Sequence, residues 1–440
     1  MEILRGPSHW PSILLARAGR YDPDGPFEEA QRAGAWAAWR RATSTMNPQS
    51  VIRVVGESGL RGRGGAGFPT GRKWRACASQ PSERRYVVAN GYEADPGAQL
   101  DRTLMEIDPH AVVEGAALAA YAVGAREAII AVKADYTVAI RRLTAAVAGA
   151  QEAGYLGESS SSGDPLRIEI QPLQGAFMLG EETALLRSLE GRPPLPDQRP
   201  PFPAVRGLHG APTVVNNVET LAAVPTIIEG GAPSFASCGL PASPGTTLFQ
   251  IVGAVASPGV VEAPFGVSLG ELLDIAGGVP RGQALKALQI GGPAGGFLGP
   301  DALETELTFE RLEELGGLLG SGTILVADES ACIVDLAGLL TRYLSDEACG
   351  KTVPCRIGTR RLWEISDRFI TGNPRPSDPE LLEQLAADVR DGALCALERT
   401  ASNPLLTGMR YFAAEFEDHI VRSTCAAGVC RPLRVAVPAH

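Results

Sequence analysis

Residues 59–74 read Gly59-Leu-Arg-Gly-Arg-Gly-Gly-Ala-Gly-Phe-Pro-Thr-Gly-Arg-Lys-Trp74, and six of these sixteen residues are glycine. Glycine permits φ > 0 and places no Cβ between backbone N–H groups and a ligand, and successive N–H groups of this kind form an anion-binding concavity. Four side chains add positive charge beside it: Arg61, Arg63, Arg72 and Lys73. Phe68 and Trp74 add flat apolar faces. Taken alone, the stretch fits either a nucleotide or flavin site or a flexible loop with solvated arginines, and the rest of the chain decides between them.

The chain after this stretch alternates between expected strands and helices. The apolar, β-branched run at residues 85–90 predicts a buried strand, and further strands are expected at residues 127–133 and 167–171. Helices are expected at residues 109–124, 135–153 and 180–190. This order is typical of an α/β fold with a parallel sheet.

Three turns carry the candidate ligand-binding residues of this sheet. One is the glycine stretch. The second, Gly91-Tyr-Glu-Ala-Asp-Pro-Gly97, carries Glu93 and Asp95, and the third holds the adjacent acids Glu181 and Glu182. Ligands bind parallel sheets outside the carboxyl ends of the strands, so we expect all three turns at that edge.

The remaining regions differ in character from this sheet. Residues 1–28 read as irregular, and helices are expected at 29–45 and 48–58. Strands at 247–252, 260–264, 287–290 and 323–327, with a helix at 267–276, predict a small β-grasp module. Four further helices are expected at 334–344, 360–370, 378–391 and 404–415.

A Pro-rich loop and an asparagine pair follow the third turn. The prolines of residues 191–212 stiffen the chain, which would hold Arg199 and Phe202 in fixed positions. Asn216 and Asn217 offer donors and acceptors of the kind that a flavin requires. Asparagine pairs in turns more often have only a local role.

Composition bounds the class of protein. With 440 residues, 45% apolar and 20% charged, the chain is expected to form about two to four globular domains. The net charge of −10 argues against general nucleic-acid binding. No run approaches about eighteen uncharged apolar residues, so no transmembrane helix is expected, and the N-terminus shows no secretory signal.

Eight cysteines are present, and with no export signal they are expected to be thiols or metal ligands rather than disulfides. Cys349 and Cys355 lie between two expected helices, and Cys395 follows forty residues later. Three thiolates from a loop and a helix start could hold an iron–sulfur cluster, and buried structural cysteines are the alternative. Cys425 and Cys430 form a second pair, which could bind metal only with ligands from elsewhere.

Several long motifs together resemble one family, the NADH-oxidising flavoprotein subunit of respiratory complex I and its relatives in NAD-dependent hydrogenases and formate dehydrogenases. The motifs, in order, are Ser58–Trp74, Gly180-Glu-Glu-Thr-Ala-Leu185, Pro200-Pro-Phe-Pro203, Pro212-Thr-Val-Val-Asn-Asn-Val-Glu-Thr220, Leu319-Gly-Ser-Gly322 and Cys349-Gly-Lys351. The resemblance covers residues from about 20 to 420 and is too specific for chance.

The resemblance implies an α/β chain with a Rossmann-like FMN domain, a ubiquitin-like β-grasp (SLBB) domain and a C-terminal helical iron–sulfur bundle. We place an N-terminal extension at 1–45, the FMN and NAD domain at 46–245, the β-grasp domain at 246–333, the bundle at 334–420 and a tail at 421–440.

The resemblance also implies roles for individual residues. FMN would be bound by Gly62, Gly64, Gly65, Gly67, Lys73, Asn90, Glu93, Gly180, Asn216, Asn217 and Thr220. NAD(H) would be bound by Phe68, Glu182, Arg199 and Phe202, with Glu93, Asp95, Glu181 and Glu182 as the catalytic acids. The cluster, a [4Fe–4S] in the family, would be held by Cys349, Cys355 and Cys395.

The sequence departs from the family pattern at the cluster. The usual Cys-x2-Cys-x2-Cys is here Cys349-Gly-Lys-Thr-Val-Pro-Cys355, with Thr352 in place of the middle cysteine. A hydroxyl has a far higher pKa than a thiol and is a poor iron ligand. The cluster is therefore expected as a [3Fe–4S], as a [4Fe–4S] with a labile iron, or not at all.

Other departures lie in the flavin and nicotinamide site. Tyr92 replaces an acid that helps to hold FMN, and Asp95 is one methylene shorter than the family glutamate. Ala76 stands where an aromatic residue is common, Arg199 where lysine is common and Phe177 where tyrosine is usual. The lost aromatic face at Ala76 and the longer reach required of Asp95 predict retained but weakened NADH binding.

Two functions follow from the resemblance. The first is an NADH dehydrogenase-type subunit that passes a hydride between NAD(H) and FMN and single electrons to iron–sulfur clusters. The second is a retuned or non-catalytic structural subunit that lost its NAD site or its cluster. The implied partners are a small thioredoxin-like [2Fe–2S] subunit and a larger iron–sulfur or molybdenum or tungsten catalytic subunit. The expected location is the cytoplasm, including the cytoplasmic face of a membrane complex.

Overall fold

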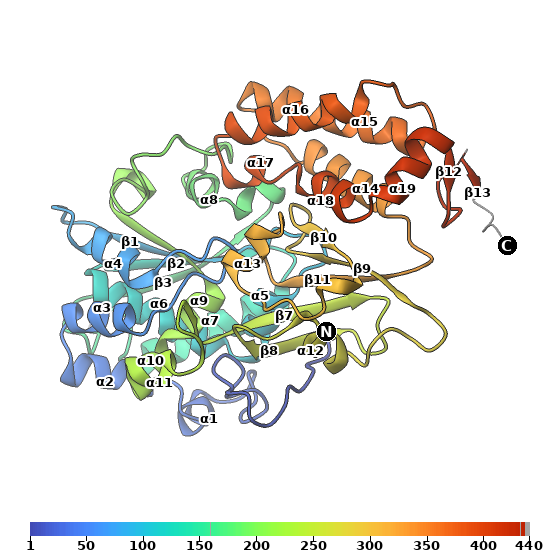
Figure 1. Cartoon of the computed structure of the whole chain (residues 1–440). Coiled ribbons are helices and arrows are strands. Elements are labelled where there is room, and N and C mark those ends of the chain that lie inside the picture. Colours follow the sequence, from blue (N-terminus) through green and yellow to red (C-terminus); the bar gives the residue numbers. More distant parts are fainter. Residues whose placement is uncertain (159, 432, 436–440) are drawn as a thin grey trace.

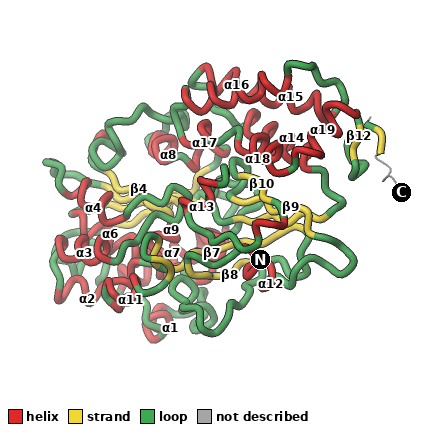
Figure 2. Tube along the Cα trace, in the orientation of Figure 1, coloured by secondary structure: helices red, strands yellow, loops and turns green. Residues whose placement is uncertain are grey.

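A computed structural model describes residues 1–158, 160–431 and 433–435. Residues 432 and 436–440 of the predicted tail lie outside this range. Figure 1 shows an α/β region at one side, a second sheet beside it and a helical bundle above that sheet. Figure 2 shows the strands of both sheets running through the middle of the molecule, with helices gathered at the left and in the upper part.

The first sheet has four parallel strands in the order β3-β2-β1-β4. Its strands are β1 (Tyr86–Gly91), β2 (Glu127–Lys133), β3 (Arg167–Leu173) and β4 (Thr213–Asn217). The first three were predicted from their apolar, β-branched residues: β1 is buried, whereas the edge strand β3 is buried at only two of its seven residues. β4 was not predicted as a strand, since its five residues end in the two asparagines.

Helices surround this sheet and connect its strands. They are α1 (Phe27–Arg32), α2 (Ala37–Thr45), α3 (Pro48–Glu57), α4 (Thr70–Ala78), α5 (Leu100–Ile107), α6 (Pro109–Val123), α7 (Thr137–Glu152), α8 (Glu182–Leu189), α9 (Val218–Ala222), α10 (Val224–Gly230) and α11 (Ala232–Ala236), with 3-10 turns η1 (Phe177–Gly180) and η2 (Leu208–Gly210). α6 is almost wholly buried. Residues at its own two ends determine where α6 begins and ends: Asp108 caps the first turn, and Gly124, at φ 71°, ends the helix.

One expectation for the N-terminal half was wrong. The single helix expected at 29–45 is two helices, α1 and α2, separated at Trp36, which has a φ of 66°. Buried Trp36 stacks on Tyr155 and donates its N–H to Glu114 at 2.7 Å, so tertiary contacts override the helical pattern. As expected, a helix leads into the glycine stretch, which connects α3 to α4.

The second sheet has five strands in the order β10-β9-β11-β7-β8. They are β7 (Thr246–Gly253), β8 (Gly259–Pro264), β9 (Leu285–Ile290), β10 (Gly296–Leu298) and β11 (Thr323–Asp328), accompanied by α12 (Leu269–Ile275), η3 (Pro300–Ala302) and α13 (Phe309–Glu314). The two-residue strands β5 (Gly239–Leu240) and β6 (Ser243–Pro244) form a hairpin before it. The central pair β7–β11 is parallel and the others are antiparallel, as a β-grasp module requires.

The C-terminal region is a helical bundle. Its elements are α14 (Ile333–Asp346), the π-helical turn η4 (Pro354–Gly358), α15 (Thr359–Ile370), α16 (Asp378–Asp391), α17 (Ala396–Arg399), α18 (Asn403–Tyr411), α19 (Ala413–Glu417), the π-helical turn η5 (Asp418–Arg422) and the small ladder of β12 (Thr424–Cys425) and β13 (Arg434–Val435). The helix expected at 404–415 is therefore interrupted at Phe412. Within the described residues, no helix is both long and apolar enough to cross a bilayer.

Candidate functional site

The glycine stretch folds back on itself and packs against two other loops. The N–H of Gly62 donates to the Phe68 carbonyl, and that of Thr70 to the Leu60 carbonyl, both at 2.9 Å. A Cβ on Gly64 would lie 3.1 Å from the Cβ of Asn217. Gly65 has a φ of 102°, and a Cβ there would lie 3.2 Å from the Gly320 carbonyl oxygen. Glycine is needed here for close approach to β4 and to the Leu319–Gly322 loop of the second domain.

Two of the four expected cations hold the protein together rather than face a ligand. The buried guanidinium of Arg63 donates to the carbonyls of Pro244 and Thr246 at 2.8 and 3.0 Å. Burial lowers the pKa of Arg63 to about 10. Arg61 forms an ion pair with Glu310 at 2.7 Å. The expectation that both arginines add charge beside the loop was therefore wrong.

Lys73 and Trp74 attach α4 to β4 at the same edge of the sheet. Lys73 Nζ donates to the Val215 carbonyl at 2.8 Å and lies 3.5 Å from a carboxylate oxygen of Glu182. Trp74 Nε1 donates to Asn216 Oδ1 at 2.9 Å. The amine of Lys73 therefore lies at the sheet edge between a strand end and the acid turn before α8.

The carboxyl ends of β1 and β4 bring the predicted asparagines together. Asn90 and Asn217 are register partners in adjacent strands. Asn90 Nδ2 donates to the Gly180 carbonyl at 3.4 Å, and Asn217 Nδ2 to Asp101 at 2.7 Å. Thr220 accepts a 2.8 Å hydrogen bond from the Arg63 N–H and so holds the glycine loop. The strand ends thus gather the residues expected around FMN.

Buried acids lie below this edge. Glu93, at a φ of 46°, accepts from the N–H groups of Asp101 and Arg102 at 2.9 and 3.1 Å and from Tyr136 Oη at 2.8 Å. Burial raises the pKa of Glu93. Burial and the charges of Glu93 and Glu219 raise the pKa of Asp101 well above its ordinary value. Asp101 was not predicted as part of the site, because nothing in its local sequence marks it.

Asp95 joins the first domain to the second. A Cβ on Gly292 would lie 2.1 Å from Asp95 Oδ2, so the carboxylate rests on the backbone after β9. Burial raises the pKa of Asp95 to about 6, against the opposite effect of a hydrogen bond from Ser321. The Leu319–Gly322 motif therefore contacts both the glycine loop and this acid.

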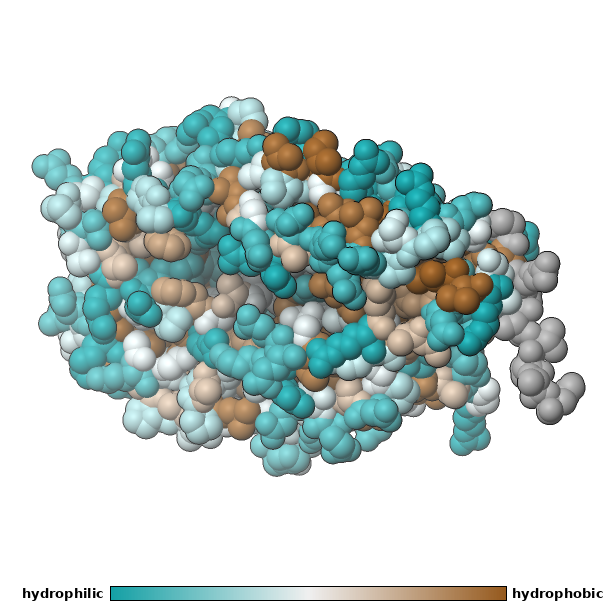
Figure 3. Space-filling model, turned by 45° about the horizontal axis from the view of Figure 1, so that its top comes forward, coloured by the Kyte–Doolittle hydropathy of each residue, from teal (hydrophilic) through white to brown (hydrophobic). Residues whose placement is uncertain are grey.

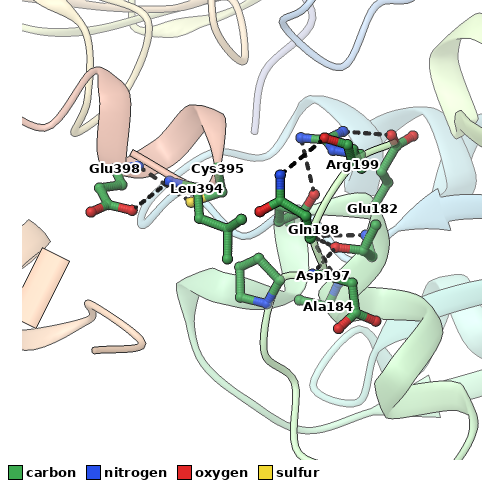
Figure 4. Close-up of polar contacts among 12 residues, drawn as sticks. Glu182, Ala184, Asp197, Gln198, Arg199, Leu394, Cys395 and Glu398 are labelled. Carbon is green, nitrogen blue, oxygen red and sulfur yellow. Dashed lines mark hydrogen bonds and ion pairs between the residues drawn. The ribbon is translucent and has the colours of Figure 1, made fainter. Parts of the chain in front are cut away.

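The second acid turn is held by Arg199 of the Pro-rich loop. Arg199 forms ion pairs with Glu182 at 2.7 Å and with Glu181 at 3.6 Å, and Figure 4 shows its side chain directed at Glu182. Glu181 also caps α8, accepting from the N–H groups of Thr183 and Ala184 at 2.9 Å. Glu182 is thus shared between Arg199 and Lys73.

The two predicted stacking residues are exposed at the surface. Phe68 is 44% exposed and Phe202 is 55% exposed. The Arg72 guanidinium lies 5.7 Å from the centre of the Phe68 ring. Exposed phenylalanines beside a cation suit stacking on a flat heterocycle that carries phosphates.

Three predicted cluster ligands converge in the bundle. Cys355 and Cys395 are buried and Cys349 is half-buried. A hydrogen bond from the Cys355 thiol lowers the pKa of Cys349 to about 6. Burial raises the pKa of Cys395 to about 11, and the charge of Cys349 acts in the same direction. Cys355 and Cys395 line one small pocket, and Cys349 lies within hydrogen-bond reach of Cys355 beside it; thiols placed in this way fit an iron–sulfur cluster.

Thr352 occupies the place of the missing cysteine and is bonded to an acid that was not predicted. Its hydroxyl donates to Glu398 Oε1 at 2.6 Å and accepts from the Cys355 N–H at 3.2 Å. Glu398 is 5% exposed and also accepts from the Leu394 N–H at 3.0 Å. The sequence signal for Glu398 is its place three residues after Cys395 in the first turn of α17.

The cysteine pocket lies directly against the flavin-site loops. Lys351 donates to the Pro196 carbonyl and lies 3.5 Å from Asp197. Figure 4 shows Leu394 and Cys395 on the side of the Asp197–Arg199 segment, with Glu182 beyond that segment and Glu398 behind Cys395, bonded to the Leu394 N–H. Two predicted sites, distant in sequence, are therefore adjacent in the fold.

Comparison with known families and proteins gives a consistent result. Residues 55–226 match the Nuo51 FMN-binding domain, residues 248–298 the SLBB domain, and residues 335–419 the NADH-ubiquinone oxidoreductase-F iron–sulfur binding region. The chain is 44% identical over 391 residues to the NADP-reducing hydrogenase subunit HndC of Solidesulfovibrio fructosivorans, covering 88% of this chain and 80% of that one. It is 41% identical over 406 residues to the F 2 subunit of the NADH-quinone oxidoreductase of Rhizobium meliloti (strain 1021), covering 92% and 96%.

A solved structure agrees with these relatives. A chain of the NAD+-reducing [NiFe]-hydrogenase in the H2-reduced state matches with a TM-score of 0.82 and 34% identity, over 95% of this chain and 67% of that one. The expected FMN domain, β-grasp domain and iron–sulfur region are thereby confirmed. The chain belongs to the family of FMN-binding, iron–sulfur flavoproteins that includes the F subunits of NADH-quinone oxidoreductases and the related subunits of NAD(P)-linked hydrogenases.

Proposed function

We propose that this chain exchanges a hydride between NAD(H) and bound FMN and delivers single electrons to an iron–sulfur cluster in its bundle. FMN supplies the conversion between two-electron and one-electron chemistry. The observation that carries the proposal is the contact between the two sites, where Lys351, next to the cysteine pocket, bonds to the Pro196 carbonyl in the loop that holds Arg199.

For FMN, we propose a position over the carboxyl ends of β1 and β4. The proposed ligands are Gly62, Gly64, Gly65, Gly67, Lys73, Asn90, Glu93, Gly180, Asn216, Asn217 and Thr220. Lys73 serves as the point charge for an anionic part of the cofactor. Asn216 and Thr220 act by holding α4 and the glycine loop, because Trp74 and Arg63 bond to them.

For NAD(H), we propose stacking on the exposed rings of Phe68 and Phe202. Glu182 and Arg199 neutralise one another at 2.7 Å, and either group can turn to a polar part of the dinucleotide. Ala76 offers no further ring, which fits the weakened binding expected from the sequence.

Among the proposed catalytic acids, the contacts divide the roles. Glu93 and Glu181 accept backbone N–H groups, so we assign them the positioning of the two turns. Asp95 and Glu182 remain as the acids that face the nicotinamide. Since burial raises the pKa of Asp95 to about 6, a small change in its surroundings alters its protonation near neutral pH.

For the cluster, we propose Cys349, Cys355 and Cys395 as the ligands. Three thiolates support a [3Fe–4S] cluster, or a [4Fe–4S] cluster in which one iron has no thiolate. Thr352 stands at that fourth position in the motif, and Glu398 is the carboxylate that accepts its hydroxyl hydrogen bond.

For partners, we propose a small thioredoxin-like [2Fe–2S] subunit and a larger iron–sulfur, molybdenum or tungsten subunit in the cytoplasm. Val353 and Ile357 flank Cys355 and are 61% and 50% exposed. Figure 3 shows apolar patches on a mostly hydrophilic face, and such patches mark protein contacts. We further propose domain boundaries at residues 45/46, 245/246, 333/334 and 420/421.

One alternative function is supported by particular observations. Tyr92, which replaces a family acid, is 1% exposed and packs in the apolar cluster with Leu179 and Leu185. It brings no charge to the site, and Thr352 brings no thiolate to the cluster. Both changes favour a retuned subunit, with weaker cofactor binding or an altered cluster.

The test is anaerobic titration of the purified, FMN-loaded protein with NADH. Loss of the flavin absorbance, followed by appearance of a cluster EPR signal, is expected. Bleaching without any cluster signal would support the retuned subunit. No bleaching at millimolar NADH in a flavin-loaded protein would contradict NAD(H) oxidation.

A further inference from the structure

A second group of cysteines lies away from the proposed cluster ligands. Cys332, Cys425 and Cys430 are 2%, 0% and 2% exposed, and the imidazole of His419 is fully buried beside them. One ligand atom from each of the four residues lies within 4.8 Å of all the others. Cys332 precedes His419 by 87 residues in the chain, so the complete set arises only in the fold.

Three separate segments build this group. Cys332 immediately precedes α14, His419 lies on the π-helical turn η5, and Cys425 ends β12. Gly428, at a φ of 69°, bends the chain after Cys425 and donates its N–H to the Cys425 carbonyl at 3.1 Å. This turn returns Cys430 to the same pocket.

The distances fit one tetrahedral ion. Cys332 Sγ lies 3.4 Å from His419 Nε2 and 3.6 Å from Cys430 Sγ. Zinc bonds of about 2.3 Å to sulfur and about 2.0 Å to nitrogen place two sulfurs about 3.8 Å apart and sulfur and nitrogen about 3.6 Å apart. The observed spacing suits a single ion rather than a cluster of several irons.

Neighbouring groups already orient two of the ligands. His419 Nδ1 is 2.8 Å from the Glu415 carbonyl oxygen, which fixes the ring with Nε2 toward Cys332. Cys332 Sγ accepts the Asp335 N–H at 3.4 Å. A backbone carbonyl on the other histidine nitrogen and an N–H donor on a thiolate are what metal ligands ordinarily have behind them.

We propose that Cys332, His419, Cys425 and Cys430 bind one zinc ion in a structural site. A tetrahedral set of three sulfurs and one nitrogen is typical of zinc or iron–sulfur sites, and the close spacing of the four ligand atoms favours the single zinc ion; four protein ligands leave no open position for chemistry. The ion fastens the end of the bundle to the entry of α14. Glu415 lies at the same joint, where it accepts from Lys286 of β9 at 3.0 Å and from the Ile333 N–H at 3.1 Å.

The site is separate from the proposed electron path. Its four ligands share no residue with Cys349, Cys355 and Cys395, and Figure 1 shows α19 and β12 at the opposite end of the bundle from α17. Zinc has no redox chemistry. Its removal should therefore loosen the C-terminal segment without removing FMN.

The experiment measures zinc in the full-length protein by mass spectrometry of the dissolved metal and by X-ray absorption at the zinc edge. About one zinc per chain, with three sulfur neighbours and one nitrogen neighbour, is expected from a closed four-ligand site. Cys425→Ala/Cys430→Ala should lose this zinc, and His419→Gln should lose it to EDTA. Cys77→Ala, at a buried thiol outside both groups, should retain it.

Retained FMN serves as the check that the variants fold. Protein purified without zinc chelators that holds no zinc, or holds iron at these ligands, would overturn the proposal. So would a Cys425–Cys430 disulfide, or zinc kept by the double variant. If the double variant does not fold, the X-ray absorption spectrum of the native protein still tests the proposal, because it gives the number of sulfur and nitrogen neighbours of the zinc.

Discussion

The hydroxyl of Thr352 donates a 2.6 Å hydrogen bond to the buried carboxylate of Glu398, three residues after Cys395. The position that carries a cysteine thiolate in the family thus forms a hydrogen bond to a carboxylate. Glu398 also donates its own N–H to Cys395 Sγ at 3.4 Å. The acid therefore connects the substituted position to a proposed cluster ligand.

Replacing Thr352 with cysteine should restore a fourth thiolate. We expect a fully ligated cluster with about four irons, because each iron of a cubane then has a cysteine ligand: iron rises from about three if the native cluster is [3Fe–4S], and the fourth iron resists chelation if it is [4Fe–4S]. Iron and sulfide analysis with EPR of anaerobically purified T352C, before and after a chelator, measures this. Thr371→Cys, outside the pocket, is the control, and a T352C cluster identical to that of the control in iron content, EPR signal and resistance to chelation would contradict the proposed ligand set.

Replacing Lys73 with alanine should weaken FMN binding. A charge-assisted hydrogen bond contributes about 1.5–3 kcal/mol, so affinity should fall at least about tenfold. Fluorescence titration of the deflavinated protein with FMN measures the change. Arg75→Ala, at an exposed cation on the same helix, should bind FMN as the native protein does; a similar loss there would argue against a specific role for Lys73.

Removing the ring of Phe202 should weaken the binding of NADH and leave the binding of FMN unchanged. One aromatic stacking partner contributes about 1 kcal/mol, which predicts an approximately fivefold rise in the NADH concentration for half-reduction. Stopped-flow bleaching of the flavin gives this value for F202A. Val205→Ala, 45% exposed on the same loop, is the matched control. A loss of FMN from F202A would contradict the prediction, because it would place the ring at the FMN site rather than at the NADH site.

Glu219 should make stability depend on pH. Burial raises its pKa from 4.5 to about 7, so the folded state binds the proton more tightly than the unfolded chain. The tighter proton binding adds to the free energy of unfolding. This contribution is fully present below pH 4.5 and is lost as the pH rises through about 7. A shift of this size corresponds to about 3 kcal/mol.

Glu219→Gln should therefore raise Tm relative to the native protein at pH 8 and much less at pH 5. The amide oxygen can still accept from Thr247 and Leu248. Thermal unfolding at both pH values measures the difference, and Glu83→Gln, at an exposed site, is the control. An unchanged difference between pH 5 and pH 8 would show that Glu219 is ionised in the fold.

The exposed apolar residues beside Cys355 should matter for assembly. Val353→Ser with Ile357→Ser should reduce recovery of the hetero-oligomer from the host, because an exposed apolar patch loses its partner contact. Native mass spectrometry compares this variant with Val421→Ser, which is 70% exposed on η5. Equal assembly of both variants would place the partner elsewhere.

The glycine stretch, the paired acids and the cysteine spacing could be recognised without the fold. Each motif is contiguous, and its chemistry depends on residue types at short separations. The strands β1 and β2 were predicted for the same reason, since buried parallel strands are largely continuous apolar runs, and β3 was predicted from Ile168 and Ile170 at the edge of the sheet. Family resemblance then gave the three domains, which the comparisons confirm.

The fold alone assigned roles to residues whose partners lie far along the chain. Arg63 reads as a ligand cation but is buried against Pro244 and Thr246, 181 and 183 residues away. Trp36 breaks an apparent helix because Glu114 and Tyr155 hold it. His419 meets Cys332 across 87 residues. Sequence motifs record local chemistry, whereas burial and long-range packing decide which of those groups meet a ligand and which meet the protein itself.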